Sequence, residues 1–252
     1  MTNNQLKYYS SLLQKKIRKT EKKFIVEGST LIDDAIDSGF KCEIIASTPL
    51  YQENNPLIID KYIINRFRTE IISNKDFEKL SDVESPQGVV GVFHEKNINT
   101  QLTNEKIICL ESISDPGNLG TILRTCDWFG FNQILLSKDC AEIFSPKVIR
   151  ASAGSVFHLE FKIDENIIKT LSYLKGKNYS VVTADIKGKN IYSHEFGNNV
   201  LIVFSNEAKG PSDELISVTD DRVMIPKFGK AESLNVSSAA AVFLSQLKSK
   251  IG

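Results

Sequence analysis

The stretch that decides the fold comprises residues 107–130 and reads IICLESISDPGNLGTILRTCDWFG. It opens with an apolar run of strand length, and an Asp-Pro-Gly turn follows a few residues later. Asn118 is predicted to cap a helix, because its side chain can accept a hydrogen bond from the first helical turn. The later apolar residues fall on one helical face, with Arg124 off that face and Gly130 as the C-terminal stop. The stretch therefore predicts a buried strand, a loop and an amphipathic helix, where backbone N–H groups and one guanidinium can converge.

The same arrangement recurs twice nearer the C-terminus. The apolar run at 200–204 ends in a polar loop at 205–210, after which a helix is predicted to begin. A short strand at 222–225 ends at Pro226, and a second polar loop leads into an apolar helix at 236–247. Three strand ends, each followed by a loop and a helix, predict an α/β fold with a mostly parallel open sheet. Ligands of such sheets bind beyond the carboxyl ends of the strands.

Taken together, these three loops resemble the signature motifs of the SpoU (TrmH-like) family of RNA 2′-O-ribose methyltransferases, a branch of the SPOUT class. Any single loop is equally consistent with an ordinary strand-to-helix turn, because Asn, Gly and Ser favour turns for conformational reasons. The matching positions are Asn118, Gly120, Ile122 and Arg124 in the first motif, Asn206, Glu207 and Gly210 in the second, and Ile225, Pro226, Ser233, Leu234, Asn235, Val236 and Ser237 in the third. The stretch SPKVIRASAGS at 145–155 is also similar to this family.

The resemblance implies a two-domain architecture. The sequences FIVEG at 24–28 and SPQGVV at 85–90 are similar to those of the small L30e-like α/β domain that precedes the methyltransferase domain in many of these enzymes. We therefore expect an L30e-like RNA substrate-binding domain at 1–95, a polar linker at 96–105 and a methyltransferase domain at 106–252. The resemblance further implies a deep trefoil knot, S-adenosylmethionine as cofactor and a homodimer formed through the C-terminal domain.

The catalytic residues that the resemblance implies are Arg124, Asn118, Glu207, Ser233 and Asn235. Arg124 is interpreted as orienting a phosphate and stabilising negative charge on the ribose oxygen, because a guanidinium with a pKa above about 12 is a poor base. Asn118 is expected to position Arg124 or the ribose, and Ser233 to contact the substrate. Glu207 is expected to hold the loop geometry and Asn235. The cofactor-binding residues implied are Ser205, Asn206, Gly210, Ile225, Pro226, Leu234 and Asn235.

Ser205 departs from the family pattern, which usually has glycine at this position. Glycine permits a positive φ or a close approach of the backbone to a ligand, and a serine side chain obstructs both. The departure is the one support for a rival interpretation, a non-catalytic RNA-binding factor of ribosome assembly. The intact Arg124, Glu207 and Asn235 favour an enzyme. A base methyltransferase on the same scaffold is disfavoured, because the first and third motifs belong to the ribose-modifying branch.

A basic segment precedes the first predicted strand. Between Leu6 and Phe24, seven Lys and Arg residues stand against the single acid Glu21. Phosphate contacts supply most of the affinity of sequence-independent RNA binding, and basic segments are their usual source. A solvated helix face, with the leucines of the segment packed inward, explains the charges equally well. The predicted RNA-binding residues are Lys15, Lys16, Arg18, Lys19, Lys22, Lys23 and Arg150.

Length and composition limit the number of domains and the class of protein. With 252 residues, 41% hydrophobic and 25% charged, the chain is long enough for two small domains. A net charge of +0 favours local basic patches over a generally basic surface. The lack of an 18-residue apolar run and of a signal-peptide pattern predicts a cytoplasmic protein that does not enter a membrane. The four cysteines lack metal-ligand spacing, so we expect reduced, mostly buried thiols and no metal.

Two further expectations concern partners. The RNA is expected to be 23S rRNA, because an L30e-like domain is commoner in the rRNA enzymes of this family than in its tRNA branch; a tRNA 2′-O-methyltransferase is the alternative. The homodimer has a reason in the sequence as well, since the helix at 236–247 carries a wider apolar surface than one sheet face requires. The small residues Ala239, Ala240 and Ala241 would let another backbone approach, although burial within the helix's own domain also explains them.

Overall fold

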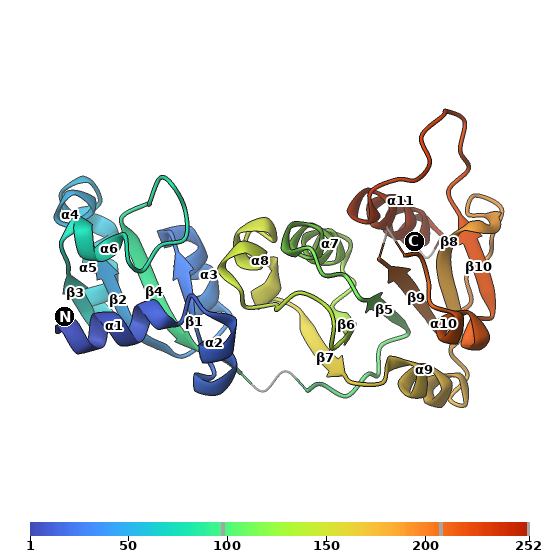
Figure 1. Ribbon diagram of the computed structural model, residues 1–252, viewed down its shortest axis with the longest axis horizontal. Coiled ribbons are helices and arrows are strands. Elements are labelled where there is room, and N and C mark those ends of the chain that lie inside the picture. Colours follow the sequence, from blue (N-terminus) through green and yellow to red (C-terminus); the bar gives the residue numbers. More distant parts are fainter. Residues whose placement is uncertain (97–98, 207–208, 251–252) are drawn as a thin grey trace. The chain divides into compact units, whose positions relative to one another are not determined.

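The computed structural model divides into two compact units, each with its own sheet (Figure 1). The structure describes residues 1–96, 99–206 and 209–250. Unit 1 comprises Met1–Lys96 and Phe144–Phe157, and unit 2 comprises Asn97–Ile143 and His158–Gly252. The division expected from the sequence placed the whole of 106–252 in one domain, and the structure differs from it by packing 144–157 with unit 1.

Unit 1 is built on a four-stranded sheet with the order β1-β4-β2-β3. The strands are β1 (Lys23–Glu27), β2 (Cys42–Ser47), β3 (Thr69–Ile71) and β4 (Val89–His94). The helices are α1 (Asn3–Ser11), α2 (Lys15–Glu21), α3 (Ser29–Asp37), α4 (Pro49–Asn54), α5 (Pro56–Ile64), α6 (Asn74–Phe77) and α8 (Pro146–Ala151). Strand β4 pairs antiparallel with β1 and β2, and β2 pairs parallel with β3. Both β1 and β4 are buried along nearly their whole length, so the sheet is covered on both faces.

An aromatic cluster explains why the segment around α8 belongs to unit 1. The ring of Phe144 stacks on Phe24 of β1 with centroids 4.6 Å apart, and Phe40 meets Phe144 edge to face at 5.6 Å. The ring centroids of Phe157 and Phe40 are 5.3 Å apart. Aromatic pairs in these arrangements contribute beyond the area that they bury. After α8, the structure has a 3-10 turn at Ser155–Phe157 and begins a strand at Glu160.

The N-terminal helices of unit 1 use part of the basic segment internally. Leu6 and Leu12 are buried in the core, and Leu13 and Ile17 pack against it. Arg18 is only 4% exposed, and its Nη1 donates hydrogen bonds to the carbonyl oxygens of Leu12 at 2.8 Å and Leu13 at 2.7 Å. Those carbonyls follow the end of α1 and would otherwise lack partners. Arg18 therefore has a structural role. Because it is buried, it is not included among the proposed RNA contacts.

Unit 2 is built on a six-stranded sheet with the order β10-β8-β9-β5-β6-β7, in which every pairing is parallel. The strands are β5 (Lys106–Glu111), β6 (Gln133–Ser137), β7 (Glu160–Asp164), β8 (Ser180–Asn190), β9 (Val200–Ser205) and β10 (Asp221–Met224). The central strands are almost continuously apolar and buried, as parallel strands covered on both faces require. The predicted α/β class and parallel open sheet are confirmed, and the trefoil knot stays a prediction.

Four helices accompany this sheet. They are α7 (Pro116–Phe129), α9 (Ile167–Lys175), α10 (Asp213–Val218) and α11 (Val236–Ser249). Helix α11 packs against α7 and β9, and the ring of Phe243 meets Phe204 edge to face at 5.5 Å. This packing brings the C-terminal helix to the same part of the sheet as the helix that follows β5.

Residues 99–105 of the predicted linker are attached to unit 2, whereas Lys96 belongs to unit 1. The N–H of Thr100 donates to the carbonyl of Phe161 on β7 at 3.0 Å. The Gln133 Oε1 atom accepts hydrogen bonds from the N–H groups of Thr103 at 2.8 Å and Asn104 at 2.9 Å. These bonds satisfy backbone groups that have no strand partner of their own.

Two features, a membrane-spanning helix and a cluster of metal-ligating side chains, are absent from the described residues. Over the described residues, no helix is both long and apolar enough to cross a membrane. The same residues contain no group of three or more His, Cys, Asp or Glu side chains placed to hold a metal ion. The four cysteines are free thiols, of which Cys42 is half-buried and the other three are buried.

Candidate functional site

The site begins where β5 and β9 end side by side. In the register of this parallel pair, Glu111 lies opposite Ser205. The Glu111 carboxylate is 8% exposed and accepts hydrogen bonds from the hydroxyls of Ser205 at 2.8 Å and Ser212 at 2.6 Å, and from the Ser212 N–H at 3.3 Å. Ser212 also caps α10 through its bond from the Leu215 N–H. One buried carboxylate thus ties the first motif's strand to both ends of the second motif's loop.

The backbone at Ser205 does not adopt a conformation that requires glycine. It is the last residue of β9 and is not among the described residues with positive φ. Its hydroxyl is used by Glu111, so the side chain is held within the sheet edge. Among the described residues of this loop, a positive φ occurs at Gly210, at 67°, where a side chain would start in open space. Ser205 therefore carries no backbone strain, which answers the first of the two objections that its side chain raised.

The second motif's loop is closed by Asn206. Its Nδ2 donates to the carbonyl of Ser112 at 3.2 Å, and its Oδ1 accepts from the Lys209 N–H at 3.3 Å. The N–H of Gly210 returns to the Asn206 carbonyl at 2.8 Å. Glu207, to which the sequence assigned a role in this loop, lies outside the described residues.

The first motif places Asn118 inside helix α7. The helix begins at Pro116, and its cap is Asp115, whose Oδ1 accepts the Asn118 N–H at 2.8 Å. The prediction that Asn118 itself caps the helix is wrong. Asp115 supplies the capping carboxylate, and Pro116, which follows it directly, is suited to the first helical position. Capping by Asp115 leaves the Asn118 side-chain amide available for another partner.

That partner is Asn235 of the third motif. The Asn235 Nδ2 donates to the Asn118 Oδ1 at 2.9 Å. Its own Oδ1 accepts from the N–H of Ser237 at 2.9 Å and from the Ser237 hydroxyl at 2.6 Å, which caps α11. The amide orientation follows from these bonds, because only the oxygen can accept from Ser237 and the NH₂ group then faces Asn118. The first and third motifs are therefore joined directly.

The remaining predicted site residues lie on the same loops. Arg124 is exposed on α7, away from the helix's buried face. Ser233 is exposed, and Leu234 is 49% exposed. Ile225 and Pro226, which follow β10, are half-buried. The structure brings Asn118, Asn206 and Asn235 into contact with the other loops, while the side chains of Arg124 and Ser233 form no hydrogen bond among the described residues.

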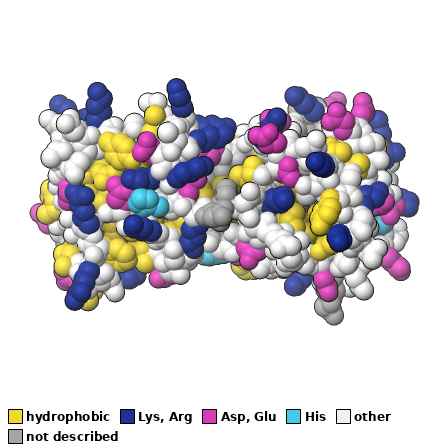
Figure 2. All heavy atoms as spheres, turned by 90° about the horizontal axis from the view of Figure 1, so that it is seen from below, with side chains coloured by type: hydrophobic (Ala, Val, Ile, Leu, Met, Phe, Trp, Pro, Cys, Tyr) yellow, Lys and Arg dark blue, Asp and Glu magenta, His cyan; other side chains and the backbone are white. Residues whose placement is uncertain are grey.

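The predicted RNA-binding residues differ in their exposure and in their partners. Lys15, Lys16, Lys19 and Lys22 are exposed, and the Lys22 Nζ lies 3.6 Å from a carboxylate oxygen of Glu95. Burial lowers the pKa of Lys23, but hydrogen bonds to Glu43 and Tyr8 outweigh it and raise that pKa overall. Arg150 forms a two-pronged ion pair with Asp82 at 2.5 and 3.0 Å. On the face drawn in Figure 2, Lys and Arg side chains are interspersed with acidic and apolar ones.

Sequence reasoning missed three residues of the site, namely Glu111, Ser112 and Ser212. One signal was available for Glu111, because it is an acid that ends an otherwise apolar strand and would be costly to bury without donors. Ser112 has a φ of 55°, an uncommon conformation for a serine, which no sequence pattern marked. Its carbonyl accepts the bond from Asn206.

The comparisons with known proteins agree with this geometry. Residues 105–245 match the SpoU rRNA Methylase family, and residues 3–91 match the MRM3-like substrate binding domain. The chain belongs to the SpoU rRNA methylase family. The Bacillus subtilis 23S rRNA (guanosine(2553)-2′-O)-methyltransferase RlmP is 28% identical over 248 residues, which cover 98% of this chain and 96% of the relative.

Two further relatives extend the likeness. The 23S rRNA (guanosine-2′-O-)-methyltransferase RlmB of Acinetobacter baylyi is 30% identical over 184 residues, which cover 68% of this chain and 74% of that protein. The solved structure of an AdoMet-bound rRNA methyltransferase from Sinorhizobium meliloti has a TM-score of 0.85 and 27% identity. That likeness covers 100% of this chain and 97% of the other. Family membership and the two-unit fold are thus supported along the whole chain.

The Glu111 network yields a stability prediction. Replacing Ser205 with Ala removes a donor to a buried carboxylate, so the free energy of unfolding should fall by about 1 to 3 kcal/mol. Ser233→Ala is the control, because Ser233 is exposed and its loss should change that free energy by no more than about 0.5 kcal/mol. Urea denaturation measures both variants. Equal midpoints for Ser205→Ala and the parent chain would show that the Ser205 bond contributes nothing to the sheet edge.

Proposed function

We propose that this chain is an S-adenosylmethionine-dependent methyltransferase that modifies a ribose 2′-hydroxyl of 23S rRNA. The observation that carries the proposal is the hydrogen bond between Asn118 and Asn235, which joins the first and third motif loops at the sheet edge. The Glu111 network holds the second motif loop at the neighbouring strand end. Three loops that resemble ordinary turns when taken singly are thus parts of one connected arrangement.

The residues at this edge suit S-adenosylmethionine. Half-buried Ile225 and Pro226, with the partly exposed Leu234, offer apolar surface to a heterocycle. Gly210 leaves the backbone open to close approach. These residues, with Ser205 and Asn206, would hold the cofactor. When bound, it supplies a methyl group already activated by the sulfonium charge.

The protein's own task is then to align the hydroxyl and assist the loss of its proton. Arg124 is exposed beside the first motif loop and carries a guanidinium with five N–H donors. In the proposal it binds a phosphate next to the target ribose and stabilises the negative charge that develops on the 2′-oxygen. Asn118, held by Asn235, orients the ribose, and the exposed Ser233 contacts the RNA.

Unit 1 is proposed to hold the RNA. Its residues 3–91 match a substrate-binding domain, and the exposed lysines of the α2 region can contact phosphates. Both curated relatives described above are named as 23S rRNA enzymes that act on guanosine, which favours ribosomal over transfer RNA and makes guanosine the nucleotide to examine first. A ribosomal substrate would place the chain in the cytoplasm. The rival non-catalytic interpretation rests on Ser205 alone, and the bond of its hydroxyl to Glu111 supports the enzymatic interpretation instead.

Arg124 provides the first test of the proposed roles. Arg124→Ala should lower the rate of methyl transfer by at least 100- to 1,000-fold, on the order of the loss of one oxyanion donor. The dissociation constant for S-adenosylmethionine, measured by calorimetry, should stay within a few-fold, because Arg124 is proposed to act on the RNA. Thr125→Ala is the control on the same helix, since the Thr125 hydroxyl donates to the Thr121 carbonyl within α7. A parallel loss of cofactor binding in Arg124→Ala would contradict the assignment.

The identity of the RNA is tested by mapping 2′-O-methyl groups in total RNA with and without the gene. We expect one 23S rRNA position to lose its methyl group on deletion and to regain it when the parent chain, but not Arg124→Ala, is restored. The loss of a methyl group from transfer RNA instead would favour the tRNA enzyme. An unchanged map together with undetectable calorimetric binding of S-adenosylmethionine would favour the non-catalytic factor.

We also propose that the active form is a homodimer through unit 2. Trp128, the single tryptophan, is 83% exposed on α7, which is unusual for so large an apolar side chain. On the neighbouring helix α11, Ala239, Ala241 and Val242 are only half-buried by their own unit. A second subunit at this surface would cover both Trp128 and these three residues of α11.

Sedimentation at micromolar concentration tests the dimer. The mass should be twice that of one chain, and Trp128→Ser should shift the equilibrium towards monomer. Because the protein has one tryptophan, dilution should also move its fluorescence to longer wavelength as Trp128 enters water. A monomer that still methylates RNA would rule out the dimer as the active form.

A further inference from the structure

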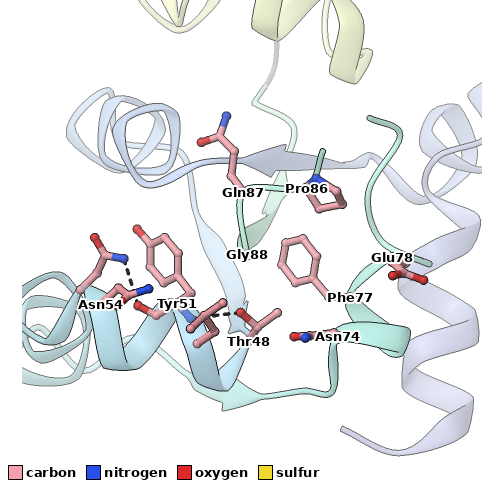
Figure 3. A pocket seen from close by; sticks show the side chains of 11 residues that line it. Thr48, Tyr51, Asn54, Asn74, Phe77, Glu78, Pro86, Gln87 and Gly88 are labelled. Carbon is pink, nitrogen blue, oxygen red and sulfur yellow. Dashed lines mark hydrogen bonds between the residues drawn. The ribbon is translucent and has the colours of Figure 1, made fainter. Parts of the chain in front are cut away.

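Unit 1 contains an open groove that no motif of the methyltransferase accounts for (Figure 3). It has a volume of about 420 Å³ and lies between the start of α4, the α6 region and the loop before β4. Its lining includes Thr48, Tyr51, Asn54, Asn74, Phe77 and Gln87. All of these residues belong to unit 1, so the groove is separate from the motif loops of unit 2.

The loop that forms one wall is anchored by a buried acid. Glu27, at the end of β1, is 6% exposed and accepts hydrogen bonds from the Ser81 hydroxyl and the Gln87 N–H, both at 2.7 Å. The next residue, Gly28, donates its N–H to the Val89 carbonyl at 3.0 Å. The two sequence stretches FIVEG and SPQGVV are therefore bound to each other. Their joint effect is to hold Gln87 at the groove in a defined position.

The opposite wall meets this loop at Gly88. Gly88 has a φ of 84°, and a side chain there would begin 3.1 Å from both Thr48 Oγ1 and Tyr51 Cβ. A residue with a side chain would be strained at this φ and would push the walls apart. Thr48 in turn caps α4 by accepting the Tyr51 N–H at 3.2 Å. The groove is thus a built feature, whose walls are fixed by backbone contacts.

The lining chemistry identifies the kind of ligand. It offers the side-chain amides of Asn54, Asn74 and Gln87, which both donate and accept hydrogen bonds. The ring of Tyr51 is half-buried, and Phe77, 1% exposed, supplies an apolar surface. None of the described residues that line the groove is Lys or Arg, and the exposed Glu78 adds an acidic side chain, so the lining is unsuited to a phosphate. A neutral, planar group with donors and acceptors on its edge fits it best.

We propose that this groove binds an unpaired base of the substrate RNA, stacked on Tyr51 and read at its edge by the amide side chains. The inference rests on the proposed function, because an RNA substrate is what brings such a base to unit 1. Single-stranded and looped RNA is commonly recognised in this way, by stacking on aromatic rings and hydrogen bonds to base edges. In this arrangement the exposed lysines near α2 bind the backbone, and the groove supplies selectivity for an unpaired nucleotide.

The test uses the full chain and a fragment of 23S rRNA that the parent chain methylates. Tyr51→Ala should weaken binding of this fragment by roughly 5- to 100-fold, the loss expected for one base stacked on an aromatic ring. Tyr51→Phe keeps the ring and should stay within about twofold of the parent chain. Tyr173→Ala, at a tyrosine that is 63% exposed on α9 of unit 2, is the matched control and should not change binding. Fluorescence anisotropy measures the RNA, and calorimetry with S-adenosylmethionine should give the same affinity for all four proteins.

A second measurement locates the base directly. The same RNA carrying 4-thiouridine or 6-thioguanosine should cross-link to peptides containing Thr48–Asn54 or Pro86–Gly88. If Tyr51→Ala binds the RNA like the parent chain, or the cross-links lie elsewhere, the groove is not a base site even though methyl transfer stands. If the parent chain methylates no RNA, the proposed function fails, and the base site fails with it.

Discussion

The candidate site depends on the parallel alignment of β5 with β9, which sets Glu111 opposite Ser205. Burying a carboxylate is unfavourable unless donors surround it, and here two serine hydroxyls and one N–H do so. Because both strands end at the same edge, the loops that follow them are neighbours. The Asn118–Asn235 bond then adds the third loop, supported by the packing of Phe243 on Phe204. Each motif is short and turn-like, and the sheet edge makes them one site.

The two units divide the work that the family's chemistry requires. In the proposal, unit 2 supplies the loops for the cofactor and the exposed Arg124, while unit 1 supplies lysines and a groove lined by amide and aromatic side chains. The same physical device recurs in both units, since a buried acid at a strand end holds the loop that bears the polar side chains. Glu111 does so for the second motif, and Glu27 does so for the loop that carries Gln87.

Much of this could be predicted from sequence, because long apolar runs and their polar ends mark buried strands and the loops that follow. The partners of Glu111 could not, because Ser205 and Ser212 lie 94 and 101 residues further along the chain. The sequence pattern does not distinguish Asp115 from Asn118 as the cap of α7, because Asp and Asn cap helices equally well; in the structure Asp115 caps it. Arg18 looks like any other basic residue until the carbonyls that it binds are seen.

The central claim is that the joined loops direct a methyl group to a ribose oxygen of RNA. The most direct measurement incubates the purified chain with S-adenosylmethionine labelled in its methyl group and unmodified 23S rRNA, and then hydrolyses the RNA in alkali. A 2′-O-methyl group prevents cleavage of the neighbouring phosphodiester, because the 2′-oxygen can no longer attack it. The account predicts label in alkali-resistant dinucleotides. Label in mononucleotides, which indicates a methylated base, would contradict it, as would the absence of transfer.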